Sequence, residues 1–303
     1  MKDAQAVTAA AVSTPARGSH VLADYASLTK PRLNFLVVAS SAAGYYLGAP
    51  GGPAALPMAE AVVGTALVAG GAAVLNQVYE RDTDALMRRT RQRPLPDKRV
   101  GPADARMYGL ALSFAGLALL ATRSNLLAAL LALATLIVYL VIYTPMKRVT
   151  PTATLVGAVP GALPPLIGWA ASHGSIDAGG AALFAIVFLW QIPHFMAIAW
   201  MYRDDYAKAG FPMLPVIEPD GVRTGRQSVV YSAALIPVSL VPTITGISGA
   251  AYFAVAQVLG IGLLVLAWRF SSSRSDAAAR ALFFGSITYL PLLWIAMILN
   301  KNG

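Results

Sequence analysis

Long apolar blocks separated by short polar segments dominate the sequence. A bilayer core about 30 Å thick is crossed by roughly 20 helical residues at about 1.5 Å each, and about nine blocks approach that length. They occupy residues 33–49, 58–78, 107–122, 125–146, 152–172, 179–202, 227–247, 250–268 and 281–299. The third block is short, so a tilted or merged helix is an alternative there. The pattern predicts an all-α, polytopic membrane protein with about nine transmembrane helices.

The charges between the blocks predict an orientation. Lys and Arg accumulate in cytoplasmic loops. If the N-terminus is inside, every basic residue except Arg123 and Lys301 precedes the first block or falls in an inside segment. We therefore predict a cytoplasmic N-terminus and a C-terminus outside. The two longest polar loops, 79–106 and 203–226, would then both face the cytoplasm.

Composition agrees with this class of protein. The chain is 57% hydrophobic and 12% charged, with a mean hydropathy of +0.61, which is too apolar for a soluble domain. The net charge of +9 is explained by the basic residues at the inner membrane face. We therefore expect the lipid bilayer or an anionic substrate as the partner of these residues, and no nucleic acid. The absence of cysteine excludes disulfides, thiolate metal sites and cysteine nucleophiles.

The first 28 residues are Ala-rich, without the basic start and continuous apolar core of a signal peptide. We interpret residues 1–28 as a disordered cytoplasmic tail and residues 29–303 as an integral-membrane domain. The bacterial cell inner membrane is the predicted location.

An acidic stripe carries the strongest chemical signal. If the second helix continues through its polar end, Asn76, Glu80 and Asp84 are spaced i, i+4 and i+8 and share one face. Such oxygen ligands suit Mg²⁺, which binds through one or two carboxylates plus substrate phosphates. Acidic residues contribute little to the membrane orientation of a chain, and placing them near the bilayer core is energetically unfavourable. The stripe therefore predicts a metal-diphosphate site, with a solvated loop as the alternative.

Basic side chains at the inner helix ends are the candidates for binding diphosphate oxygens. An alternative for the loop arginines is that they only set the orientation of the chain in the membrane, by the positive-inside rule, and bind no substrate. Asp205, at the start of the second polar loop, would supply a further carboxylate. The candidate substrate-binding residues are Arg32, Arg91, Arg93, Tyr143, Lys147, Arg148, Arg203 and Lys208. His194 lies inside a predicted span, where a packing role is the usual one and a ligand role the alternative.

Six segments resemble, in their order along the chain, the UbiA-type intramembrane prenyltransferases, and in detail the branch that farnesylates haem. They are LTKPR, NQVYERDTDALMRRTRQRPLP, YTPMKR, GALPPLIGWAA, WQIPHF and DDYAKAGFPMLPV, and the resemblance covers about residues 22–300. It implies a bundle of nine helices whose central cavity opens to the cytoplasmic side. It further implies Mg²⁺-dependent transfer from farnesyl diphosphate to a vinyl group of haem B, contact of His194 with haem, and a downstream haem A synthase as partner.

The family pattern also assigns Asn76, Glu80, Asp84 and Asp205 to catalysis and metal binding, with two departures. Glu80 stands where the motif NxxxDxxxD has an aspartate. The second DxxxD is absent, because the residue four positions after Asp205 is Ala209, which leaves open whether one or two Mg²⁺ bind. Two other interpretations are a UbiA-type enzyme with a quinone-precursor acceptor and a transporter. Acids at helix ends, away from the bilayer midplane, disfavour a transporter.

Overall fold

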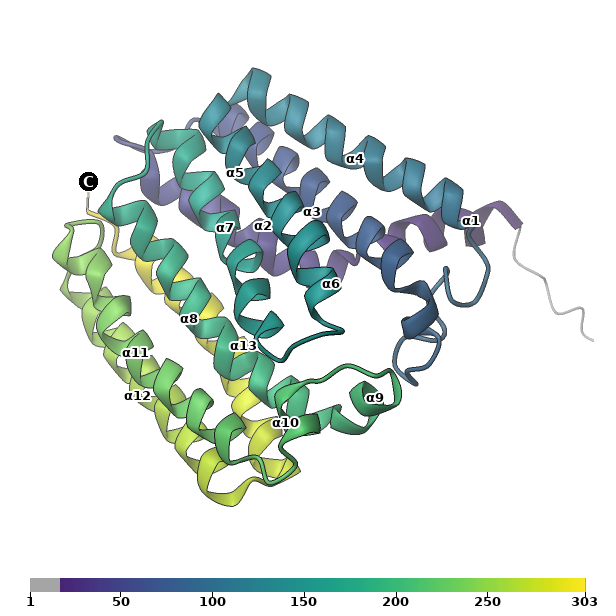
Figure 1. Ribbon diagram of the computed structural model, residues 1–303. Helices are drawn as coiled ribbons and strands as arrows, with labels where there is room; N and C mark the ends of the chain where they lie inside the picture. Colours follow the sequence, from purple (N-terminus) through teal and green to yellow (C-terminus); the bar gives the residue numbers. More distant parts are fainter. Residues whose placement is uncertain (1–16, 303) are drawn as a thin grey trace, which may run out of the picture.

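The computed structural model describes residues 17–302, and these form a helical bundle (Figure 1). The long helices are α2 (Pro31–Gly48), α3 (Ala55–Asp84), α4 (Pro102–Arg123), α5 (Leu126–Ile137), α7 (Ala153–His173), α8 (Ala178–Met201), α11 (Val222–Ile244), α12 (Ala250–Ser273) and α13 (Asp276–Leu299). The remaining helices are α1 (Arg17–Leu28), α6 (Thr144–Met146), α9 (Arg203–Lys208) and α10 (Leu214–Ile217). A π-helical turn, Val138–Tyr143, joins α5 to α6.

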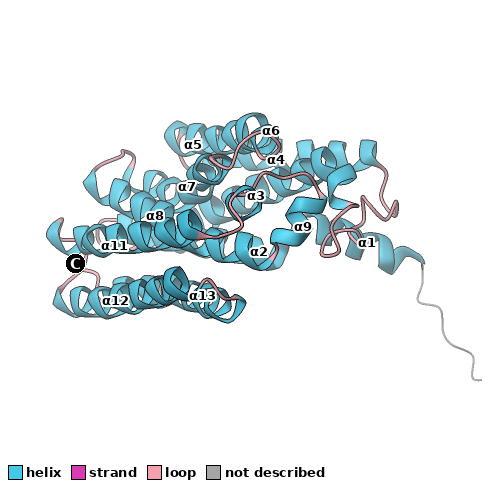
Figure 2. Cartoon of the chain, turned by 60° about the horizontal axis from the view of Figure 1, so that its bottom comes forward, coloured by secondary structure: helices cyan, strands magenta, loops and turns pink. Residues whose placement is uncertain are grey.

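Eight of these helices are long and apolar enough to cross a bilayer, with α5 to α6 counted as one. The shorter α2 packs between α3 and α7 and completes the predicted set of about nine. Apart from one isolated bridge between Ser248 and Lys301, the described residues contain no strand (Figure 2). The fold class predicted from the hydrophobic pattern is confirmed.

Two apolar cores share the central helices. One is built from α2, α3, α4, α5 and α7, and the other from α8, α11, α12 and α13 with residues of α2 and α7. The helices α3, α6 and α8 all finish at one end of the bundle, where α9 and α10 also lie (Figure 1). We call this the polar end, because it carries the long polar loops.

Helices α2 and α7 cross closely because small residues line the crossing. A Cβ added at Gly168 would lie 1.9 Å from the backbone oxygen of Ser41, and one added at Gly44 would lie 2.0 Å from that of Pro165. Small residues let helix backbones approach in membrane proteins, where packing drives association. This contact holds the two cores together.

Replacing Gly168 with alanine is expected to destabilise the fold by about 1–3 kcal/mol, because the new methyl group forces the two backbones apart. The measurement is the midpoint temperature for loss of monodisperse protein in detergent. Gly262→Ala on α12 is the matched control, since a Cβ there meets no atom within 4 Å. Equal midpoints for the two variants would contradict the close crossing.

Two sequence-based boundaries need correction. Residues 17–28 were predicted to be disordered but form α1, because Leu28 is buried with Val74 and Leu95 and Tyr25 packs edge-on against Tyr108 at 5.2 Å. Residues 1–16 lie outside the described residues. The short third block is a full helix, α4, because its first turns come from the polar stretch that begins at Pro102.

Candidate functional site

The predicted acidic stripe lies at the polar end of α3. The helix runs unbroken to Asp84, so Asn76, Glu80 and Asp84 lie on one face, as their spacing predicts. Their exposed fractions are only 1%, 6% and 1%. Burying two carboxylates is costly unless each has a charged or hydrogen-bonding partner. The burial of these three side chains therefore excludes the alternative that the stripe is a solvated loop.

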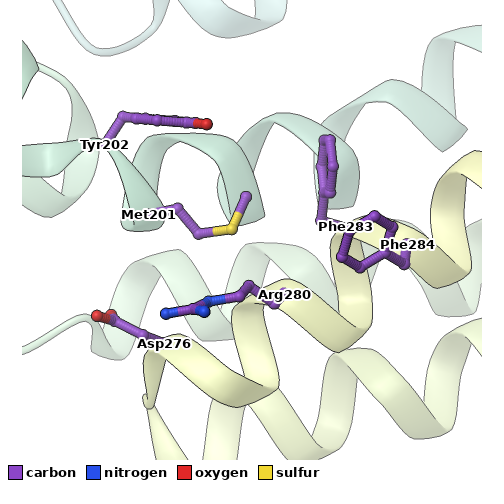
Figure 3. Close-up of a pocket in the computed structure, with 6 residues that line it drawn as sticks. All are labelled: Met201, Tyr202, Asp276, Arg280, Phe283 and Phe284. Carbon is purple, nitrogen blue, oxygen red and sulfur yellow. The ribbon is translucent and has the colours of Figure 1, made fainter. Parts of the chain in front are cut away.

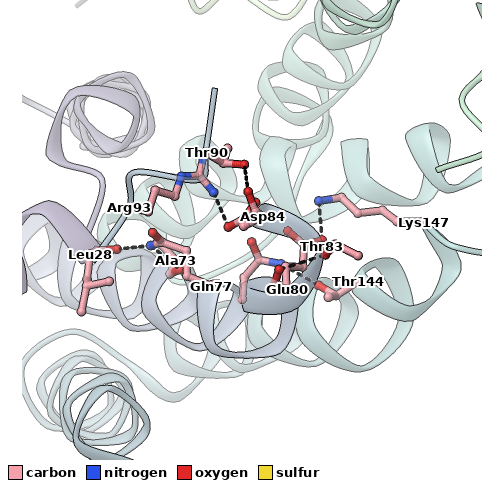
Figure 4. Close-up of polar contacts among 11 residues, drawn as sticks. Leu28, Ala73, Gln77, Glu80, Thr83, Asp84, Thr90, Arg93, Thr144 and Lys147 are labelled. Carbon is pink, nitrogen blue, oxygen red and sulfur yellow. Dashed lines mark hydrogen bonds and ion pairs between the residues drawn. The ribbon is translucent and has the colours of Figure 1, made fainter. Parts of the chain in front are cut away.

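Each carboxylate is paired with a cation from another segment (Figure 4). Lys147 Nζ donates to Glu80 Oε1 at 2.8 Å, and Arg93 Nη1 donates to Asp84 Oδ2 at 2.7 Å. Each of these hydrogen bonds uses a single carboxylate oxygen. The Asn76 side chain also forms a hydrogen bond with the Glu80 carboxylate. Because a carboxylate has about four lone-pair positions, both groups keep acceptor capacity for a further ligand.

The π-helical turn before α6 orients the Asn76 amide. Thr144 Oγ1 donates to the Tyr139 carbonyl at 2.7 Å, which uses its only proton. The hydroxyl must then accept the 3.1 Å hydrogen bond from Asn76 Nδ2. This arrangement turns the amide nitrogen toward Thr144 and leaves Asn76 Oδ1 as a free oxygen ligand beside the two carboxylates.

The loop after α3 is folded back against the helix end. Thr90 Oγ1 donates to the Asp84 carbonyl at 2.7 Å, and the Arg93 amide donates to the Thr90 carbonyl. Leu95 and Val100 anchor the next turns in the small core beneath. These contacts hold Arg93 at the stripe.

The two polar loops meet. Met87 of the first loop packs with Ala209 and Phe211 of the second. The Arg89 guanidinium lies 5.1 Å from the centre of the Tyr202 ring. The segment that carries Asp205 is therefore a neighbour of the loop that follows the acidic stripe.

Lys30, which shares the segment LTKPR with the predicted Arg32, is a further basic residue near the stripe. It lies between α1 and α2 in a left-handed conformation, with φ of 50°. Burial, followed by the charge of Arg93, lowers the pKa of Lys30 to about 7, and the charges of Glu80, Lys147 and Asp84 also act on it. Its position within LTKPR was the available signal, whereas Arg32 is exposed.

Lys147 is cationic. Desolvation opposes its charged form, but the neighbouring Tyr143 and Glu80 hold the pKa of Lys147 well above its ordinary value. The ammonium also lies 4.8 Å from the centre of the Tyr143 ring. The structure thus gathers Asn76, Glu80, Asp84, Arg93, Tyr143 and Lys147.

The remaining predicted binding residues lie outside this cluster. Three basic residues, Arg91, Arg148 and Lys208, are exposed. Arg203 donates to Asp276 Oδ1 at 2.8 Å and stacks on Trp200. Asp205 is half-buried on α9. The roles assigned to these residues remain predictions.

The donor set fits a divalent cation that also contacts its substrate. Within the described residues, no three His, Cys, Asp or Glu side chains converge as a closed metal site. The two carboxylates of the stripe each have one oxygen that is not used in the ion pair, and Asn76 offers an amide oxygen. A hard cation of the Mg²⁺ type needs one or two protein carboxylates and takes its other ligands from phosphate and water.

His194 lies deeper in α8, with its ring stacked between Trp190 and Phe283 at 5.1 Å from each. Ser286 Oγ donates its proton to the Phe283 carbonyl at 2.7 Å. The 2.8 Å contact between His194 Nδ1 and Ser286 Oγ therefore has the ring nitrogen as donor. This tautomer leaves a lone pair on Nε2.

Comparison with known proteins gives consistent results at the levels of family, sequence and fold. The sequence profile described as the UbiA prenyltransferase family matches residues 37–289. A protein named protoheme IX farnesyltransferase from Solibacter usitatus is 46% identical over 92% of this chain and 99% of its own length. One of the same name from Anaeromyxobacter sp. is 45% identical over 98% of this chain and its own full length (100%).

Solved structures share the fold at low identity. A UbiA homologue from Archaeoglobus fulgidus, solved bound to GPP and Mg²⁺, has a TM-score of 0.66 at 18% identity, covering 90% of this chain and 99% of its own. A digeranylgeranylglyceryl phosphate synthase structure has a TM-score of 0.78 at 16% identity, covering 93% and 98%.

Proposed function

The chain belongs to the UbiA prenyltransferase family, and on that premise we propose that it transfers the farnesyl group of farnesyl diphosphate to a vinyl group of haem B. The product is haem O and the leaving group is diphosphate. The observation that carries the proposal is the buried stripe of Glu80 and Asp84, each hydrogen-bonded to one cation through a single carboxylate oxygen. The names of relatives at 40–46% identity supply the acceptor.

The reaction begins at the bond between C1 of the farnesyl chain and the diphosphate oxygen. This bond breaks with its electron pair on oxygen, and the allylic cation bonds to the terminal vinyl carbon of haem B. The cation left beside the porphyrin ring takes up water and releases a proton, which gives a hydroxyethylfarnesyl group. Fixed donors aimed at the leaving group supply the main stabilisation.

The diphosphate would be received by the basic residues at the polar end. Lys30, Arg93 and Lys147 approach the stripe from three different segments. Mg²⁺ would be held by Glu80 and Asp84 with the Asn76 amide oxygen, and when bound it stabilises the growing charge on the leaving group. Asp205 and Arg203, from the second polar loop, are proposed as further contacts. The apolar bundle would hold the farnesyl chain and keep water from the cation.

The predicted orientation places this chemistry at the cytoplasmic side of a bacterial inner membrane, with the N-terminus inside and the C-terminus outside. The product would pass to a haem A synthase or directly to an oxidase. The basic residues concentrated at the polar end support this orientation.

The function is tested with the full chain in phosphatidylcholine vesicles containing haem B, farnesyl diphosphate and Mg²⁺. Mass spectrometry is expected to find haem O, and removal of Mg²⁺ with EDTA is expected to abolish its formation. A parallel reaction offers an aromatic quinone precursor as acceptor. Prenylation of that precursor with none of haem B would reject the proposed acceptor.

His194 is proposed to contact the haem iron through Nε2. His194→Ala is expected to lower haem B affinity by about tenfold or more and to change the absorption spectrum of bound haem, because the free lone pair is lost. His173→Ala, near the opposite end of the bundle, is the control and is expected to bind haem as the wild type does. An unchanged spectrum with normal haem O formation by His194→Ala would reject the role.

A further inference from the structure

A cavity opens at the polar end, between α8 and α13. Its volume is about 340 Å³, and it is lined by Met201, Tyr202, Asp276, Arg280, Phe283 and Phe284 (Figure 3). The lining combines aromatic rings and a thioether with one cation and one acid. This volume is near the lower end of the range of about 300–1,000 Å³ for ligand sites, so the cavity suits one edge of a large ligand.

The cation in this cavity is free to bind a ligand. The carboxylate of Asp276 accepts from Arg203 at 2.8 Å. Arg280 is exposed and, among the described residues, forms no ion pair within 4 Å, although its charge acts on the nearby Asp276. Its guanidinium extends along the cavity beneath Met201 (Figure 3). The cavity therefore presents an unpaired fork of donors suited to a carboxylate.

The cavity adjoins both parts of the proposed active site. Tyr202, in its wall, lies under the Arg89 guanidinium of the loop that carries Arg93. Phe283, also in its wall, stacks on the His194 ring at 5.1 Å. A ligand seated here would reach from the polar end, where Arg280 lies, toward His194 in the apolar interior.

We propose that Arg280 binds a propionate carboxylate of haem B and thereby orients the acceptor. The inference rests on the proposed function. Haem B is an apolar plate with two carboxylates on one edge and its vinyl groups on the opposite part of the ring. Holding the carboxylate edge at Arg280 exposes the macrocycle to Phe283 and Phe284 and directs the vinyl groups away from the membrane surface. Charge complementarity thus selects both the acceptor and its direction of entry.

The test compares haem B with its dimethyl ester, whose carboxylates are uncharged, in vesicles of phosphatidylcholine alone so that no anionic lipid competes. The wild type is expected to show a KM about tenfold higher for the ester, the size expected when a charged hydrogen bond is lost. Arg280→Gln is expected to raise the KM for haem B by the same factor and to leave that for the ester unchanged. The KM for farnesyl diphosphate should stay within about twofold of wild type, because Arg280 is proposed to contact only the acceptor.

Arg269→Gln is the matched control, because it removes another exposed arginine, from α12 near the same turn. It is expected to keep the wild-type preference for haem B, and Arg280→Lys to keep part of it. If Arg280→Gln raises both KM values together, or the wild type does not distinguish haem B from the ester, the inference is overturned. Failure of the proposed function is a different result, in which the wild type forms no haem O at all.

Discussion

Asp84→Asn is expected to lower the rate of farnesyl transfer by about 10²–10³-fold or more, the cost of losing one preorganised electrostatic contact to a developing charge. Asp84 is 1% exposed, and its carboxylate accepts from Arg93 at 2.7 Å. The amide has the same shape but carries no charge, so it weakens the proposed Mg²⁺ site and releases Arg93 from its position. The measurement is haem O formation with Mg²⁺ titrated at saturating substrates.

Asp82→Asn is the matched control for this variant. It removes the same charge two residues away on the same helix, but the Asp82 side chain is 81% exposed and its partner is the neighbouring Arg81. Such a surface pair contributes little, so the control should stay within about twofold of wild type. If Asp84→Asn has the wild-type rate and Mg²⁺ dependence, the assignment of the stripe is wrong. If both variants lower the rate of haem O formation equally, the loss comes from the net charge of the helix end and not from a specific contact of Asp84.

The stripe itself could be predicted because helix geometry alone fixes it. Once α3 continues to Asp84, the spacing i, i+4, i+8 places Asn76, Glu80 and Asp84 together whatever surrounds them. The bundle was predictable for a similar reason, since the bilayer permits few ways to satisfy backbone hydrogen bonds. These are local constraints, and they do not depend on which segments meet in three dimensions.

The partners of the stripe could not be predicted in the same way. The patch LTKPR offers Lys30 and Arg32, and only the left-handed turn at Lys30 decides which one lies near the carboxylates. Among the loop arginines, Arg93 reaches Asp84 because the chain turns back at Thr90. The sequence shows which basic residues are available, whereas the path of the loop determines which of them contacts a carboxylate.

Thr144 was missed for a related reason. Its role comes from a π-helical turn, which the apolar pattern of the fourth span does not reveal, and from a partner 68 positions away in the chain. Its signal was its place within YTPMKR, directly before Pro145. Such turns occur frequently at functional sites.

Glu80→Gln is expected to lower the rate of farnesyl transfer by about 10²-fold or more. A double-mutant cycle with Lys147 measures how much of this loss comes from the ion pair between the two residues. Glu80 Oε1 accepts from Lys147 Nζ at 2.8 Å, so the amide loses the ion pair as well as a metal ligand. Lys147→Met alone should also slow transfer, because it removes a cation proposed to bind diphosphate. If the pair acts as one unit, the double variant will be slower than the slower single variant by less than about threefold.

The variant Glu80→Asp tests what the longer glutamate side chain contributes to the rate and to the Mg²⁺ requirement. Aspartate keeps the charge but is shorter by one methylene, so it cannot reach both Lys147 and a metal from the same backbone position. We expect Mg²⁺ dependence to persist, with a higher Mg²⁺ requirement and a rate lower by about tenfold. Combining Glu80→Asp with Lys147→Met should then cost little beyond Lys147→Met itself, because the contact that aspartate loses is already absent. Strictly additive effects on the logarithm of the rate would show that Glu80 and Lys147 act independently, and the 2.8 Å contact would then have no part in catalysis.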